Sequence, residues 1–216
     1  MNKKILVILT SLLLVGLAFA VTPVWAQEQG EETVSIGEVS DPGILPDSPF
    51  YFMKGWGRTI RLFFAFNAQE KARLALRFAN EDVLAIKKLC DKGECQLAEE
   101  HCEKFQEQFQ RAMQWMERAR EEGKDVEALI EKLKENHLRQ QQVLASVLEK
   151  VPEEASEGIL KAIENSSFGL ENAIERIQGK HKMEQFQEEL NLQFSNVGEE
   201  TRIRIQERLE ARHHKP

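Results

Sequence analysis

The chain has 216 residues, of which 42% are hydrophobic and 30% charged, and its net charge is −7 at pH 7. The apolar fraction is too large for a wholly disordered chain, and six Pro and twelve Gly give few turns for a many-stranded sandwich. Three Cys cannot make a disulfide-dense scaffold, and the acidic balance argues against general nucleic-acid binding, which needs a basic face.

Residues 1–26 are typical of a secretory signal peptide. A basic start precedes the apolar run of residues 5–21, and Val24 and Ala26 suit the −3 and −1 positions of a cleavage site. The alternative is an uncleaved membrane anchor, because a run of this length is at the lower edge of what spans a bilayer. The sequence therefore predicts a secreted or extracytoplasmic protein of the cell envelope, or alternatively one with an N-terminal anchor.

Residues 27–41 are acidic and show no sustained period, so we expect a flexible spacer there. We expect a helical bundle domain over residues 42–178 and a helical C-terminal extension over residues 179–216. Gly179 is expected to end the last helix of the bundle domain.

From residue 67 onward, apolar residues recur at alternating steps of three and four, which predicts amphipathic helices packed along a seam. Asn67 is expected to cap the first of these helices, with Glu70 completing a capping box. The short turn at residues 91–94 predicts an antiparallel hairpin between the first two helices. Two further helices are expected, one from about residue 125 and one opened by Pro152.

Residues 180–212 carry a thinner apolar pattern that Gly198 interrupts, and strand signals are almost absent from the whole chain. The predicted fold class is all-α. We expect an antiparallel helical bundle of about four core helices, with helical extensions at both ends.

Residues 50–66 hold seven of the sixteen aromatic residues, together with three basic ones. Ser48 is expected to cap a helix here, with Pro49 in its first turn. The segment suits a peripheral membrane helix or a partner-docking face. We favour a helix whose rings pack into the core, because a fully buried Phe contributes about 1.5–3 kcal/mol to stability. The candidate interaction or packing residues are Phe50, Tyr51, Phe52, Trp56, Phe63, Phe64 and Phe66.

The stretches LPDSPFY at residues 45–51 and KVPEEA at residues 150–155 are the most specific motifs in the chain. With the helical segments between them, they resemble a family of exported bacterial and archaeal proteins, catalogued as a domain of unknown function, number five-six-six-seven. The resemblance extends over residues 42–178. It implies an exported helical domain with no known activity, and it supplies no catalytic residues.

Cys90, Cys95 and Cys102 form, with His101, a C-x4-C-x5-H-C pattern. Thiolate and imidazole are suitable metal ligands, but the spacing is not that of a C-x2-C zinc knuckle. Cys90 ends one predicted helix and Cys95 begins the next, and export favours oxidation. We therefore predict a Cys90–Cys95 disulfide with Cys102 as a small core residue, while a metal site and three reduced thiols remain the alternatives.

His137 lies on the apolar stripe of the third predicted helix, beside Gln140 and Gln141. A histidine in such a place can be a ligand or a pH-sensitive core group. We favour a hydrogen-bonded, partly buried residue with a structural role.

No catalytic motif stands out in the sequence. There is no H-E-x-x-H, no G-x-S-x-G and no Gly-rich phosphate loop, and the one Glu-x-x-His pair, Glu210 with His213, lies in the tail. We therefore expect neither enzymatic activity nor a cofactor.

The leading functional hypothesis is an exported, non-enzymatic helical module that acts by surface interaction, at the cell envelope or outside the cell. Its partner is an unidentified protein or envelope component and not a nucleic acid. One alternative is a metal- or redox-responsive module that uses the Cys90, Cys95 and Cys102 cluster. The other is a peripheral membrane protein that uses residues 50–66. The sequence gives no oligomeric state.

Overall fold

A computed structural model describes residues 34–213, and this part of the chain folds as an all-α helical bundle, as predicted. Within it, the sole β-type pairing is an isolated bridge between Ile36 and Val39. The predicted signal peptide, residues 1–26, lies outside the described residues. The α-helices are α2 (Tyr51–Phe63), α3 (Ala68–Asp91), α4 (Cys95–Glu121), α5 (Glu127–Leu148), α6 (Ser156–Gln178), α7 (Lys180–Gln193) and α8 (Glu199–His213).

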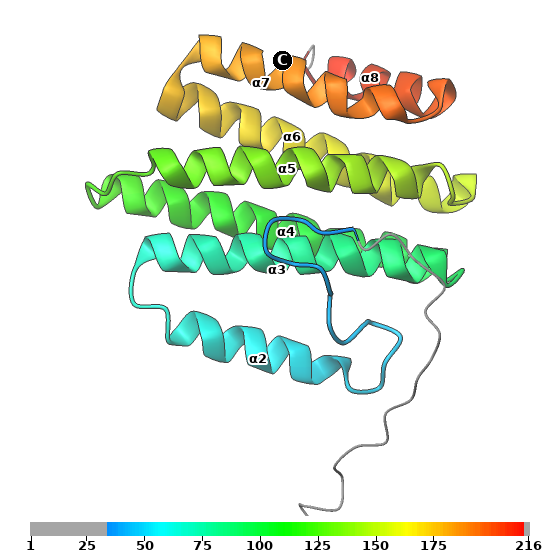
Figure 1. The fold of residues 1–216 in the computed structure, drawn as a ribbon, viewed down its shortest axis with the longest axis horizontal. Helices are drawn as coiled ribbons and strands as arrows, with labels where there is room; N and C mark the ends of the chain where they lie inside the picture. Colours follow the sequence, from blue (N-terminus) through cyan, green and yellow to red (C-terminus); the bar gives the residue numbers. More distant parts are fainter. Residues whose placement is uncertain (1–33, 214–216) are drawn as a thin grey trace, which may run out of the picture. The chain divides into compact units, whose positions relative to one another are not determined.

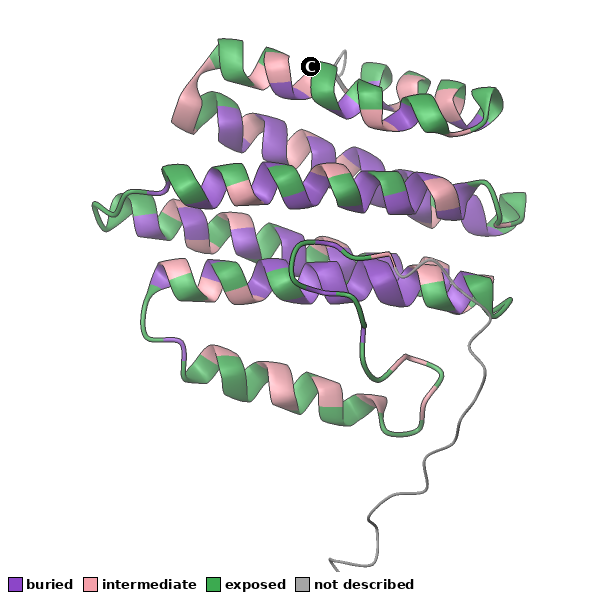
Figure 2. Cartoon of the chain, viewed as in Figure 1, coloured by how far each residue is buried: buried purple, intermediate pink, exposed green. Residues whose placement is uncertain are grey.

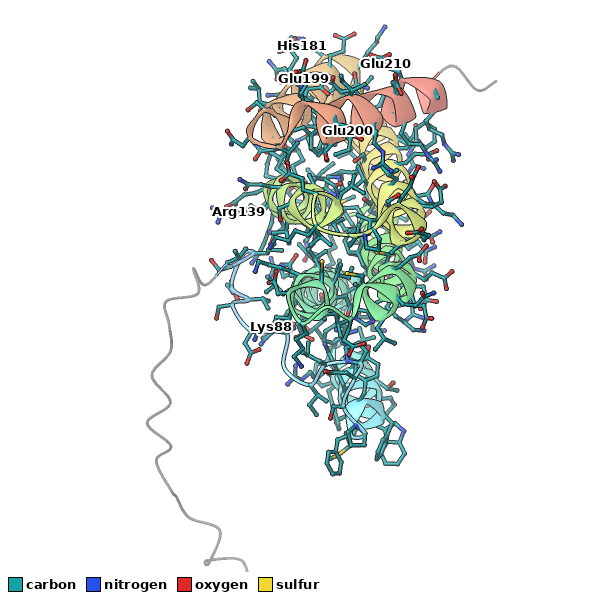
Figure 3. The ribbon with its side chains drawn as sticks, turned by 90° about the vertical axis from the view of Figure 1, so that its right-hand side faces the viewer. Lys88, Arg139, His181, Glu199, Glu200 and Glu210 are labelled. Carbon is teal, nitrogen blue, oxygen red and sulfur yellow. The ribbon has the colours of Figure 1, made fainter. Side chains whose placement is uncertain are left out.

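The helices of this unit lie side by side as near-parallel rods, with α2 at one edge and α7 with α8 at the opposite edge (Figure 1). Viewed end-on, the hairpin of α3 and α4 lies next to α2, and the pair of α5 and α6 separates that hairpin from α7 and α8 (Figure 3). Among the described residues, no helix is both long enough and apolar enough to span a bilayer.

The helix boundaries follow local signals in the sequence. The Asn67 side chain accepts a hydrogen bond of 2.8 Å from the backbone N–H of Glu70, and the Glu70 carboxylate accepts one of 3.1 Å from the N–H of Phe66. The predicted cap of α3 is therefore confirmed. Ser48 accepts from the N–H of Phe50, but α2 begins later than expected, at Tyr51.

Two breaks between helices were also predicted correctly. The turn after Asp91 contains Gly93 at φ +84°, and α6 ends at Gly179, which has φ +91°. Positive φ is strained for residues with a Cβ, so glycine allows the chain to reverse at these points.

The core runs through the whole described unit. Among its largest fully buried side chains are Phe105 and Phe109 of α4, Phe186 of α7 and Phe194 just after it. Ile205 of α8 is also fully buried. The predicted C-terminal extension is thus helical, and its apolar residues share the core of the bundle.

The described half of the predicted spacer is packed on the bundle and not free of it. Ile36 and Val39 are buried, and their backbones exchange hydrogen bonds of 2.9 and 3.1 Å in a tight turn. Asn80 of α3 donates to the Ile36 carbonyl at 3.2 Å and to the side-chain oxygen of Asn136 at 2.7 Å. The expectation of a flexible segment is wrong for these residues, because two apolar side chains and a buried amide pair hold them.

Candidate interaction surface

Helix α2 presents its apolar side to solvent. Trp56 is 69% exposed, Phe63 is 81% exposed, and no residue of α2 is buried, which Figure 2 shows as a helix without purple. The prediction that the rings pack into the core is therefore wrong for six of the seven aromatic residues, and Tyr51 alone among them is half-buried. We call the exposed set the aromatic face; it comprises Phe50, Phe52, Met53, Trp56, Ile60, Phe63, Phe64 and Phe66.

The polar side of α2 is turned toward α3. The Arg58 guanidinium donates to both carboxylate oxygens of Asp82, at 2.7 and 3.0 Å, and to Glu81 at 3.1 Å. It also lies over the ring of Phe78, 4.9 Å from its centroid. Lys54 donates to the carbonyl of Pro42 at 2.9 Å, and its ammonium lies within 4.0 Å of Glu81 and Asp82. A bidentate arginine–carboxylate pair fixes orientation as well as contributing energy.

Asp82 is the centre of this ionic cluster, which we define as Lys54, Arg58, Glu81, Asp82 and His101. Its carboxylate is fully buried, with Oδ1 3.2 Å from Nε2 of His101 on α4. Burial alone would raise the pKa of Asp82, but hydrogen bonds from His101 and Arg58 outweigh it and hold the pKa below its ordinary value. The carboxylate therefore stays ionised and keeps its cations close.

The ring of Tyr51 closes one side of the ionic cluster. It packs edge-on against His101, with ring centroids 5.9 Å apart. Burial and the nearby charge of Asp82 raise the pKa of Tyr51 to about 12, so the phenol is neutral.

The ionic cluster explains why the orientation of α2 was not predicted. Glu81 and Asp82 directly precede Val83 on the apolar stripe of α3, and we did not assign them a role. Two adjacent buried carboxylates need cations, and Lys54 and Arg58 supply them from one side of α2. The signal that the sequence offered was this pair of adjacent acidic residues, Glu81 and Asp82, beside the apolar stripe of α3. The pair determines which side of α2 points inward.

Two arginines near the end of α2 have no ion-pair partner among the described residues. Arg61 belongs to α2 and Arg73 to the first half of α3, and both are exposed. Arg61 lies within the same stretch of chain as Phe63, Phe64 and Phe66, the last of which is 90% exposed. Positive charge and large apolar side chains therefore occur together at this end of the aromatic face.

The structure brings together two of the three cysteines. The sulfurs of Cys90 and Cys95 face each other across the α3–α4 turn at 3.8 Å, and both are thiols here. Cys102 is buried elsewhere and donates to the carbonyl of Ala98 at 3.4 Å. His101 belongs to the ionic cluster. The four predicted metal ligands therefore do not converge, and within residues 34–213 no group of three or more acidic, His or Cys side chains is placed to hold a metal ion.

The thiols of Cys90 and Cys102 are not activated. Burial is the main cause that raises the pKa of Cys90 to about 11, and the contact of Cys90 with Cys95 is the second cause. Burial also raises the pKa of Cys102 to about 12. Reactive cysteines have a lowered pKa, so the environment of this cluster does not favour a redox-responsive role. The Cys90–Cys95 disulfide stays a prediction.

The model of one protein family, a domain of unknown function (DUF5667), matches residues 43–154, just over half of the chain. The chain belongs to this family. The DUF5667 region begins shortly before α2 and ends after α5, so it contains the aromatic face and the ionic cluster. No curated protein and no solved structure matches the chain. The description of the DUF5667 family states no activity.

Proposed function

We propose that this protein is an exported, non-enzymatic helical module that contacts a membrane surface through the aromatic face of α2. The observation that carries the proposal is the orientation of α2, whose polar side is held by the ionic cluster while its rings face solvent. A contiguous exposed patch of large apolar side chains marks an interaction site. An amphipathic helix that lies along a bilayer presents this type of apolar face to the lipid.

Charge and side-chain type favour lipid over a protein partner. Helices that lie in a membrane interface carry Trp, Phe and Leu on the side that enters the lipid, and the aromatic face is made mostly of Phe and Trp. Arg61 and Arg73, which have no ion-pair partner in the described part of the chain, are available to anionic lipid headgroups. Because the chain as a whole is acidic, an anionic bilayer would repel its other faces and select this one.

Export rests on the pattern of residues 1–26, which predicts processing after Ala26. The absence of enzymatic chemistry is likewise part of the proposal. Asp82 and His101 form a buried pair of the type that catalysis uses, but both contact the groups that hold α2 in place. An intact-mass measurement of protein recovered from outside the cytoplasm tests the export step directly.

Membrane contact is tested by co-sedimentation with vesicles of phosphatidylglycerol and phosphatidylcholine. The wild-type protein is expected to sediment with the vesicles, and the double variant Trp56→Glu/Phe63→Glu to bind at least tenfold more weakly. Tenfold corresponds to about 1.4 kcal/mol, less than the transfer energy of one buried ring. The control is Leu192→Glu, which places one such charge at an exposed leucine of α7 and should leave binding unchanged.

A second readout places the contact on α2. Bromine-labelled lipids should quench part of the tryptophan fluorescence in the wild-type protein, and Trp56→Phe should remove that part. Equal sedimentation of the wild-type protein and the double variant, with unchanged helical circular dichroism, would overturn the proposal. So would a protein that ignores vesicles but forms a dimer that Trp56→Glu dissociates, since the aromatic face would then bind a second copy.

A further inference from the structure

A cavity of about 820 Å³ lies between α2, α3 and α5 and shares Ile60 and Phe64 with the aromatic face. Its walls come from the C-terminal end of α2 with the residues just after it, the first half of α3, the first half of α5, and the packed segment around Val39. The volume is within the range of about 300–1,000 Å³ that is usual for small-molecule sites. Trp56 does not line it, so the cavity and the outer surface of α2 can be tested separately.

The body of the cavity is apolar. Val39 and Leu129 are buried in its wall, and Leu74 is half-buried there. Ile60 and Phe64 complete the lining and are 57% and 62% exposed. A ligand with an alkyl chain would cover these side chains and remove apolar surface from water.

The polar residues of the lining leave positive charge available. Glu38 is paired with Lys132 at 3.1 Å, and Glu70 accepts the hydrogen bond from Phe66 that caps α3. Arg61 and Arg73 have no carboxylate partner within the described chain. Glu38 thus has a cationic partner and Glu70 a backbone donor, while the guanidinium groups of Arg61 and Arg73 have no partner within the described chain.

The amide groups of the lining are also occupied. Asn80 donates to Asn136 and accepts from Gln140 at 2.6 Å, and Asn136 donates to the Lys132 carbonyl at 2.7 Å. These hydrogen bonds hold the wall of the cavity together. They leave Arg61 and Arg73 as the polar groups available to a ligand. Guanidinium groups bind carboxylates and phosphates in a bidentate manner.

We infer that this cavity binds a single-chain anionic amphiphile, with its alkyl chain against the apolar wall and its carboxylate or phosphate on Arg61 and Arg73. The apolar body excludes a fully polar anion, and the arginines select against a cationic head. The inference does not rest on the proposed membrane contact, because such a ligand binds from solution. Both a free fatty acid and a lipid-derived alkyl phosphate present this chemistry.

The test is calorimetric titration of the purified protein with sodium laurate and with dodecyl phosphate, each below its critical micelle concentration. At least one is expected to bind with a stoichiometry of one, and the tighter of the two identifies the head group. Dodecyltrimethylammonium, which has the same chain and the opposite charge, is expected to bind at least tenfold more weakly. Equal binding of the cationic and anionic probes, or binding of neither anion, would overturn the inference.

Two variants locate the site. Arg61→Glu/Arg73→Glu should weaken anion binding at least tenfold. Ala128→Trp, at an exposed lining position of α5, should fill the cavity and weaken binding without altering Trp56 or Phe63, which do not line it. Arg111→Glu, an equal charge change per site at an exposed arginine of α4 outside the cavity, should bind as the wild type does.

The two proposals fail separately. Trp56→Glu/Phe63→Glu should retain laurate binding while losing vesicle binding, and Ala128→Trp should show the opposite behaviour. If Ala128→Trp binds the amphiphile as the wild type does, the cavity is not the site, whatever the vesicle result.

Discussion

His137 lies at the centre of the bundle, where rings from two other helices surround it. Its ring centroid is 4.8 Å from that of Phe109 on α4 and 6.0 Å from that of Phe186 on α7. The Gln141 amide lies 3.4 Å from Nδ1, and Ser167 Oγ lies 3.2 Å from Nε2. Because it is fully buried, its pKa is lowered to about 3 and the ring is neutral near pH 7. The expectation of a hydrogen-bonded structural residue is confirmed, although burial is complete and not partial.

This buried neutral histidine predicts an acid-dependent loss of stability. The unfolded chain takes up a proton near the ordinary pKa of 6.5, whereas the folded protein resists it down to about pH 3. The free energy of unfolding should therefore fall by up to about 1.4 kcal/mol for each pH unit below pH 6 from this residue alone. Urea denaturation at pH 7.5, 5.5 and 4.5 measures the slope.

The variant His137→Gln should have a shallower slope than the wild type by that amount. The matched control is His181→Gln, because His181 lies on the outer surface of α7 at the far edge of the bundle (Figure 3) and should leave the slope unchanged. Identical slopes in the wild type and His137→Gln would contradict the prediction.

The three thiols should differ in reactivity. In reduced native protein, iodoacetamide at pH 8 is expected to label the half-buried Cys95 first, and Cys90 more slowly because its pKa is raised to about 11. Cys102, with a pKa raised to about 12 by burial, should react only after denaturation. Peptide mass spectrometry over a time course checks the order, and rapid native labelling of Cys102 would contradict it.

At the scale of the element, α2 shows what periodicity can and cannot predict. The steps of three and four correctly predicted helices along α3 to α6, because their apolar sides are buried against each other. A helix near residues 50–66 was also predicted, from the Ser48 and Pro49 cap signal and the aromatic cluster, but with the wrong side inward. Hydrophobic spacing identifies two sides of a helix, whereas the ion pairs of Arg58 with Asp82 decide which one faces the protein.

Breaking the ionic cluster should detach α2. In Arg58→Met, Asp82 would be a buried carboxylate without its bidentate partner, and exposing it to water relieves that cost. We expect backbone amides of residues 51–63 to exchange hydrogen at least tenfold faster, while α3 to α6 retain their protection. Hydrogen exchange read by mass spectrometry measures both regions in one experiment.

The control for this variant is Arg77→Met. Arg77 is 54% exposed at its side chain and contacts Glu81 at 3.6 Å, and exposed pairs contribute about 0–1 kcal/mol. Its exchange pattern should match that of the wild type. Wild-type protection of α2 in Arg58→Met would show that the remaining contacts of Lys54 and Tyr51, and not the Arg58 pair, hold the helix in place.

At the scale of the whole molecule, the matched family region is smaller than the folding unit. It ends at residue 154, before α6 begins, yet α6 packs against α4 and α5, and α7 packs against α5 and α6. The apolar pattern of residues 180–212 indicated helices but not their partner. Periodicity shows which side of a helix is buried and leaves open what covers it, so the extension could not be assigned to the core from sequence.

Phe186 tests whether α7 belongs to the folding unit. Its side chain is fully buried and its ring faces His137, so Phe186→Ala should lower the free energy of unfolding by about 3–5 kcal/mol through lost burial and the cavity left behind. Leu192→Ala, at a residue of the same helix that is 67% exposed, should change it by less than about 0.5 kcal/mol. A small effect at Phe186 would mean that α7 docks without contributing to the stability of the bundle.

The tight turn of Ile36 and Val39 makes α2 part of a loop that is closed on α3. The Ile36 carbonyl accepts a hydrogen bond from Asn80 of α3, and the chain returns at Asn67, which caps the same helix. If the ionic cluster breaks, α2 therefore remains linked to α3 at both ends. This linkage limits the conformational entropy that α2 gains on release, so a detached α2 should dock again readily.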